Sequence, residues 1–124
     1  MSAKRIYWVG AALDEIRALP EQARCEAGHQ LHAVQLGRMP SDWKPMRTVG
    51  PGVIELRLHL INEYRVLFVA RHAEAIYVLH AFEKKSRRTS QPALEVGRRR
   101  FREMMQLRRT IPHASEQADV EKNS

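Results

Sequence analysis

Residues 53–82 read VIELRLHLINEYRVLFVARHAEAIYVLHAF, and this stretch decides the fold. In its first run, VIELRLHL, isoleucine and leucine alternate with Glu55, Arg57 and His59, which predicts a strand with one apolar and one polar face. Short polar turns separate this run from YRVLFVA and AIYVLHAF, both rich in β-branched and aromatic residues. The three runs therefore predict an antiparallel three-stranded meander.

Extended and helical patterns surround the meander. The apolar residues of 4–9 predict a short strand, and apolar side chains at helical spacing predict helices over 11–19, 20–36 and about 93–109. Residues 38–48 contain two prolines and a Ser-Asp pair, so we expect an ordered loop there. This order predicts an α+β fold, in which helices pack on one face of an antiparallel sheet made of the N-terminal strand and the meander. The other face is left for chemistry.

The chain length and composition suit one small domain. The 124 residues fit one domain over 1–110. The remainder, 111–124, has little to bury and is expected to be a flexible tail. Cys25 is the single cysteine and cannot form an internal disulfide, and no apolar run reaches the roughly 20 residues of a membrane span. We therefore expect a cytoplasmic protein.

Positive charge is concentrated near the end of the predicted domain. The formal net charge is +7, and the segment 84–109 holds ten basic residues against two acidic ones. Such asymmetry predicts a nucleic acid or an acidic protein as a partner, and a solvated basic helix is the alternative. The arginines of 98–102 run around the predicted helix, so only some of them can face one ligand.

Two arginines are expected to face each other on the polar side of the meander. The alternation places Arg57 on one strand where it can lie across from Arg65 on the next. Two like charges in that position repel each other. They are tolerated where an acid such as Glu55 neutralises them, or where the site binds an anion such as a phosphodiester.

The last run adds further basic and aromatic side chains. His80, Phe82 and Lys84 share one face by a period of two. Cations that neutralise phosphates, beside a ring that can stack on a base, are typical of single-stranded RNA recognition. The residues expected to contact RNA are Lys44, Phe82, Lys85, Arg87 and Arg88.

The same face has the groups that RNA cleavage needs. Attack by the 2′-hydroxyl requires a base, a cation that stabilises the phosphorane, and an acid for the leaving 5′-oxygen. Arginine suits the middle role, and His80 or His59 could transfer protons. A lone strand histidine is more often a structural hydrogen-bonding group than a catalyst.

Several short motifs, in order, resemble a known toxin family. They are Trp8-Val9, Leu19-Pro20, Ala27-Gly28, Gln35-Leu36-Gly37, Lys44-Pro45-Met46, Gly50, Gly52-Val53-Ile54-Glu55-Leu56-Arg57, Tyr64-Arg65-Val66 and Tyr77-Val78-Leu79-His80-Ala81-Phe82-Glu83-Lys84-Lys85-Ser86. Together they resemble the phage-derived Gp49-like branch of the RelE/HigB toxins, from about Trp8 to Arg109. The strand Gly-Val-x-Glu-Leu, then Tyr-Arg, then Leu-His-Ala-Phe-x-Lys-Lys is the most specific part.

The resemblance implies a RelE-like sheet flanked by helices and a metal-independent endoribonuclease without a cofactor. It also implies cleavage of mRNA in the ribosomal A site and neutralisation by a helix-turn-helix, HigA-like antitoxin. By the same resemblance, Arg57, Arg65 and Lys84 match basic residues of the RelE-type active site. The tyrosine that RelE-type enzymes place shortly after the last strand has no equivalent in 86–90, which leaves His80 or Lys85 as substitutes in proton transfer.

Two other functions fit the same sequence. A ParE-like inhibitor of DNA gyrase shares the implied fold but binds a protein rather than cutting RNA. A nonenzymatic RNA-binding phage regulatory module would use the same basic surface without chemistry.

Overall fold

The fold of residues 3–111 is described by a computed structural model, in which the α+β class is confirmed. All but the first residue of the predicted tail lies outside the described part of the chain. The elements are β1 (Ile6–Trp8), α1 (Ala12–Ala18), α2 (Glu21–Gln35), β2 (Trp43–Pro45), β3 (Val53–His59), β4 (Glu63–Val69), β5 (Ile76–Lys84) and α3 (Gln91–Arg109).

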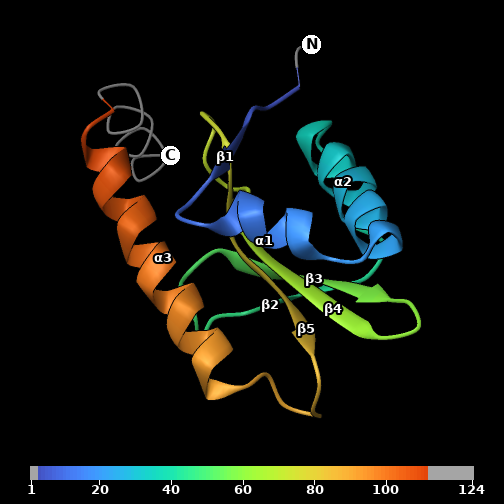
Figure 1. The fold of residues 1–124 in the computed structure, drawn as a ribbon. Coiled ribbons are helices and arrows are strands. Elements are labelled where there is room, and N and C mark those ends of the chain that lie inside the picture. Colours follow the sequence, from blue (N-terminus) through green and yellow to red (C-terminus); the bar gives the residue numbers. More distant parts are fainter. Residues whose placement is uncertain (1–2, 112–124) are drawn as a thin grey trace.

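The five described strands form one sheet in the order β1-β5-β4-β3-β2 (Figure 1). The predicted meander is present as the antiparallel strands β3, β4 and β5. β1 pairs parallel to β5, so the sheet is mixed rather than wholly antiparallel, because the alternation of side chains carries no information on strand direction. β2 lies in the segment 38–48, where a loop was expected, and Pro45 is tolerated because β2 is an edge strand.

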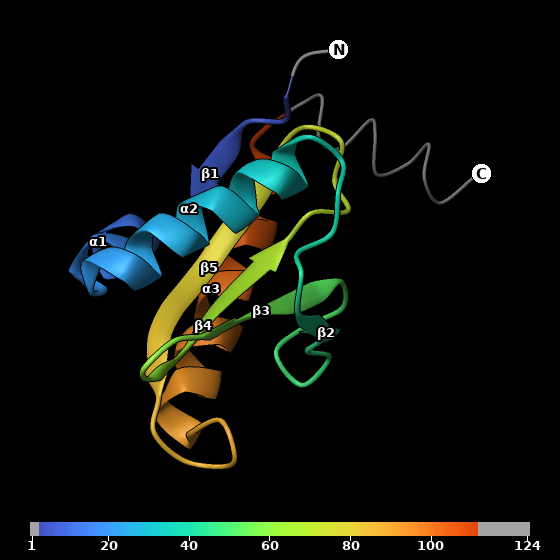
Figure 2. The same ribbon diagram turned by 90° about the vertical axis from the view of Figure 1, so that its right-hand side faces the viewer.

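Helices cover both faces of the sheet, which corrects the expectation of a single covered face. α1 and α2 pack on one face over a core that includes Leu56, Val66 and Phe68 (Figure 1, Figure 2). α3 lies on the other face over a second core that includes Val53 and Leu67. These two residues occupy the predicted polar face but are apolar, so at this end of the meander both faces need a cover.

The apolar packing of α3 covers only part of the sheet face on which this helix lies. Toward the β3–β4 turn, the apolar positions Val53 and Leu67 give way to Arg57 and Arg65 on the same face. The polar half of the sheet therefore lies beside α3 rather than beneath it. In this half Lys44 and Arg57 reach solvent, whereas Glu55 and Arg65 are buried.

A β-bulge interrupts the pairing of β4 and β5. Phe68 is paired with Val78, whereas the preceding residue, Leu67, is paired with His80, so Leu79 is an extra residue in β5. Beyond the bulge, Phe82 is paired with Arg65.

Two buried ion pairs fix α3 to the rest of the domain. Arg100 Nη1 lies 2.6 Å from Glu15 Oε1 of α1, and Arg108 Nε lies 2.6 Å from Glu74 Oε2 in the β4–β5 connection. Burial by itself raises the pKa of Glu15, but hydrogen bonds from His80 and Arg100 outweigh it and lower this pKa to about 2. Part of the basic character of α3 is therefore structural.

The close packing of α3 predicts opposite effects of the same substitution in two helices. A Cβ atom at Gly97 would lie 2.9 Å from Leu67 Cδ1 and 3.1 Å from Val49 Cγ1, whereas one at Gly28 of α2 would meet open space. We expect Gly97→Ala to lower the free energy of unfolding by about 1–3 kcal/mol through overpacking. Gly28→Ala, the matched control, should raise it by up to about 1 kcal/mol through helix propensity.

Urea unfolding of the two variants measures both effects. Equal stabilisation by both substitutions would mean that α3 does not pack closely on the sheet.

Candidate nucleic-acid interface

Basic side chains from four neighbouring strands gather on the uncovered half of the sheet. Arg57 on β3 is directly opposite Arg65 on β4, as the alternation predicts. Lys44, on β2, is opposite Glu55, and Lys84 lies on β5 opposite Glu63. Four strands therefore bring four cations to one surface.

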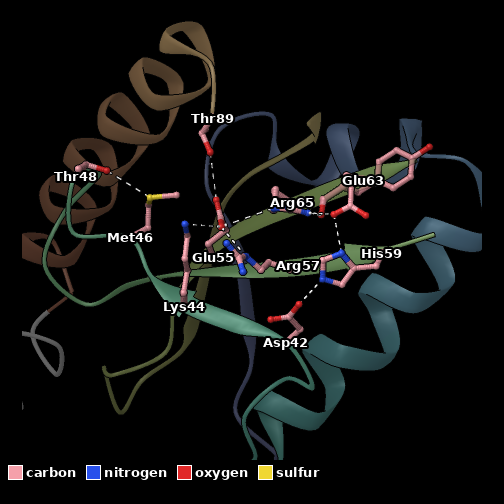
Figure 3. A network of polar contacts seen from close by, with 11 residues as sticks. Asp42, Lys44, Met46, Thr48, Glu55, Arg57, His59, Glu63, Arg65 and Thr89 are labelled. Atoms are coloured by element: carbon pink, nitrogen blue, oxygen red, sulfur yellow. Dashed lines mark hydrogen bonds and ion pairs between the residues drawn. The ribbon is translucent and has the colours of Figure 1, made fainter. Parts of the chain in front are cut away.

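The carboxylate of Glu55 lies at the centre of three of these cations (Figure 3). Its Oε1 atom is 3.3 Å from Arg57 Nε, 3.8 Å from Arg65 Nε and 3.9 Å from Lys44 Nζ. Thr89, which precedes α3, donates from Oγ1 to Glu55 Oε2 at 3.4 Å. Glu55 thus supplies the neutralising charge that the Arg57–Arg65 pair requires.

The cations differ in how much they face solvent. The side chains of Lys44 and Arg57 are 46% and 28% exposed, whereas that of Arg65 is 5% exposed. Arg65 Nη1 donates to the Tyr64 carbonyl oxygen at 2.9 Å and to Glu63 Oε1 at 3.1 Å. Lys44 and Arg57 are therefore placed to touch a ligand, and Arg65 contributes its charge from below.

The position of Lys84 alters its acid–base behaviour. Burial, followed by the positive charge of Arg65, lowers the pKa of Lys84, and Glu55 acts in the opposite direction. A lysine of this kind can exchange protons with a substrate.

A histidine bridges two carboxylates at the edge of the basic cluster, which consists of Lys44, Arg57, Arg65 and Lys84. His59 contacts Asp42 through Nε2 and Glu63 through Nδ1, the latter at 2.7 Å (Figure 3). Hydrogen bonds to Asp42 and then to Glu63 raise the pKa of His59, which favours the imidazolium form. The two carboxylates bind opposite nitrogens of the ring, and no group of three or more His, Cys, Asp or Glu side chains within 3–111 is placed to hold a metal ion.

His80 faces the interior rather than the basic cluster. Its Nδ1 atom lies 2.7 Å from Glu15 Oε1, the same oxygen that binds Arg100. Its ring stacks on Phe82 with centroids 4.8 Å apart. These contacts are of the kind that a structural strand histidine makes, and the ring on which His80 stacks belongs to Phe82, the residue paired with Arg65.

The remaining predicted RNA-binding residues follow β5. Lys85, Arg87 and Arg88 are exposed, and Lys85 Nζ lies 3.4 Å from Glu83 Oε2. A hollow of about 170 Å³ lies beside them. Its lining consists of Phe82, Glu83, Lys84, Lys85, Ser86, Arg88 and Ser90.

Sequence reasoning missed three contributors to this region. The pairing of Glu15 with His80 and Arg100 joins residues from three elements, and no local pattern indicates it. Asp42 lies in the expected loop just before β2, and its contact with His59 depends on the unpredicted pairing of β2 with β3. Thr89 reaches Glu55 from the segment 86–90, in which the arginines suggested RNA contacts and the threonine gave no signal of its own.

Comparison with known proteins identifies a family. The family model described as phage derived protein Gp49-like (DUF891) matches residues 14–102. That range spans α1 to most of α3 and contains the whole basic cluster. No curated protein matches the chain. None of the helices within 3–111 is both long and apolar enough to cross a membrane.

Proposed function

Because the chain belongs to the phage-derived Gp49-like family, a toxin branch related to RelE and HigB, we propose that it is a ribosome-dependent mRNA endoribonuclease that arrests translation. The observation that carries this proposal is the convergence of Lys44, Arg57, Arg65 and Lys84 on one uncovered surface. These four cations outnumber the buried carboxylate of Glu55. Such an excess of positive charge favours binding of a phosphodiester.

The side chains of this surface contact the substrate in different ways, according to how much of each is exposed. Arg57 is exposed enough for its guanidinium to bind two phosphate oxygens, and Lys44 supplies a second solvent-facing charge. Arg65 strengthens the field beneath the phosphate. Phe82, held by His80, offers a ring on which a base can stack, while Lys85, Arg87 and Arg88 bind flanking phosphates.

The proposed reaction is attack by the substrate's own 2′-oxygen. A new bond forms between the 2′-oxygen and phosphorus while the bond from phosphorus to the 5′-oxygen breaks, which gives a 2′,3′-cyclic phosphate and a free 5′-hydroxyl. The 2′-hydroxyl proton passes to the base, and the acid returns a proton to the 5′-oxygen. Lys44, Arg57 and Arg65 stabilise the charge that grows on the phosphorane oxygens.

Two groups on the surface fit the proton-transfer steps. Lys84 suits the base, because it lies opposite Glu63 on the same sheet face as Arg65, and burial and Arg65 lower its pKa. His59 suits the acid, because Asp42 and Glu63 raise its pKa and favour the imidazolium. His80, our first candidate from the sequence, is assigned instead to placing Phe82, since Glu15 and Arg100 occupy its surroundings.

A partner antitoxin follows from the toxin-like family. We propose that this partner is a HigA-like helix-turn-helix protein and that it suppresses toxicity when the two are expressed together. The chain's positive charge favours an antitoxin with an acidic toxin-binding segment.

Inducible expression in bacteria, followed by mapping of mRNA 5′ ends, tests the function. We expect growth arrest with new ends in phase with codons inside translated messages. The Arg57→Ala protein, if folded, should produce neither effect. Arrest with intact mRNA and damaged DNA would support gyrase inhibition instead, and RNA binding without arrest would indicate a regulatory module.

A further inference from the structure

We propose that Glu55 is a positioning residue whose buried carboxylate keeps Lys44, Arg57 and Arg65 assembled as an anion-binding site before any ligand arrives. The identity of that anion as an RNA phosphate rests on the function proposed above. The assembly of the site in the free protein does not.

The first support is the way in which the cations share one atom. Arg57, Arg65 and Lys44 all approach Glu55 Oε1, at 3.3–3.9 Å, and Oε2 is left to Thr89. These distances exceed the roughly 2.7–2.9 Å of a strong charge-assisted hydrogen bond. Among these three side chains Arg57 alone donates a hydrogen bond to Glu55, so the carboxylate gathers the cations while using little of their capacity to donate.

Unused hydrogen-bonding capacity is visible at both arginines. Within 3–111 the side chain of Arg57 donates one hydrogen bond, from Nε to Glu55, which leaves its terminal nitrogens for a ligand. Arg65 Nε is buried and has no hydrogen-bond partner in the same range. A buried donor that lacks a partner is costly, and the charge of Glu55, 3.8 Å from this atom, offsets part of the cost.

The second support is the depth of Glu55. Its side chain has no exposed surface, whereas those of Lys44 and Arg57 are 46% and 28% exposed. An incoming phosphate meets the cations from the solvent side, and Glu55 remains beneath them. The carboxylate therefore holds the site together and does not compete with the ligand for the same position.

The third support is the electrostatic link between Glu55 and Lys84. Glu55 raises the pKa of Lys84, whereas burial and then Arg65, Lys44 and Arg57 lower it. The charged groups around Lys84 are Lys44 on β2, Glu55 and Arg57 on β3, Glu63 and Arg65 on β4, Glu83 on β5, and Lys85 and Arg88 in the loop that follows. Glu55 thus orders the cations and also adjusts the proton affinity of Lys84.

The variant Glu55→Gln tests this role because it keeps the shape of the side chain and removes its charge. We follow the arginine Nε–H and lysine ammonium signals of the full chain by NMR, with inorganic pyrophosphate as the anion. In the wild type the Arg57 and Arg65 Nε–H signals should be sharp without added anion. In Glu55→Gln they should broaden, and pyrophosphate should restore them. The pKa of Lys84 should fall, because Glu55 raises it in the wild type.

Cleavage gives a second readout. We expect Glu55→Gln to lower single-turnover mRNA cleavage about tenfold, with the base-dependent limb of its pH profile shifted to lower pH. Glu83→Gln is the matched control, since Glu83 is adjacent to Lys84 but pairs with Lys85 and does not contact the arginines. It should leave the arginine signals unchanged.

The outcomes separate this inference from the proposed function. Sharp arginine signals in Glu55→Gln without pyrophosphate would overturn the role of Glu55, even if the wild type cuts mRNA. A wild type that cuts no mRNA, but whose Glu55→Gln variant behaves as expected in NMR, would overturn the function alone.

If Glu55→Gln does not fold with pyrophosphate present, Glu55→Asp takes its place. That variant keeps the charge, and it should keep sharp arginine signals; their loss would contradict the proposal.

Discussion

Replacing Lys84 by glutamine is expected to slow cleavage of ribosome-bound mRNA by about 10²–10⁴-fold, the usual contribution of a general acid or base. Lys84 combines a position at the end of β5, beside the basic cluster, with a pKa lowered by burial and by Arg65. Glutamine retains much of the side chain's length but cannot accept the 2′-hydroxyl proton. Single-turnover cleavage on purified ribosomes measures the chemical step directly.

Lys85→Gln is the matched control for this prediction. Lys85 is the next residue in the chain, but its side chain is 82% exposed and pairs with Glu83. The variant removes the same formal charge and should change cleavage by only a fewfold, through weaker phosphate binding. Equal losses in the two variants would mean that Lys84 contributes charge alone and transfers no proton.

Loss of the Glu15 charge is expected to have the largest effect on stability. Glu15→Gln leaves Arg100 and His80, both nearly buried, without their shared acid. We expect the free energy of unfolding at pH 7 to fall by about 3 kcal/mol, which agrees with the usual cost of breaking a buried pair and with a pKa lowered from 4.5 to about 2. Glu103→Gln, which removes an exposed acid 3.9 Å from Arg99, should cost under about 0.5 kcal/mol.

The same variant should alter the dependence of stability on pH. The pKa of Glu15 is lower in the folded protein than in the unfolded chain, so its contribution is present above about pH 5 and is lost as pH falls toward 2. Burial raises and hydrogen bonds from Arg108 and Tyr77 lower the pKa of Glu74, also to about 2, so Glu74 follows the same course. Urea unfolding between pH 7 and 3 should show that the stability of Glu15→Gln falls less steeply with acid than that of the wild type. An unchanged slope would contradict the pairing.

Local patterns in the sequence were sufficient for much of the fold. The alternation in 53–60 predicted β3 and the pairing of Arg57 with Arg65, because a strand that is buried on one side has a period of two. The three helices begin and end within about two residues of their expected positions. β2 was not predicted, because three residues with a proline have no periodicity, and they form a strand only through pairing with β3.

The site was harder to predict because it depends on contacts between distant segments. Glu55 and the two arginines could be grouped from one meander. The interior position of His80 could not, since it depends on Glu15, 65 residues away in the chain. The alternation of side chains along the strand correctly placed His80, Phe82 and Lys84 on one face. It does not indicate which of the three the helices cover.

The bulge at Leu79 sets the register in which the last residues of β5 join the basic surface. Because β5 has one residue more than β4 at that point, the face that contains Tyr77 and Leu79 continues as His80, Phe82 and Lys84. If β5 kept all its residues but lost the bulge, Leu79 would pair with Leu67 and every later residue would shift by one, so Glu83 rather than Lys84 would lie opposite Glu63. Loss of the bulge would therefore reverse the sign of the charge at the proposed base, whereas deletion of Leu79 itself would leave Lys84 in its place.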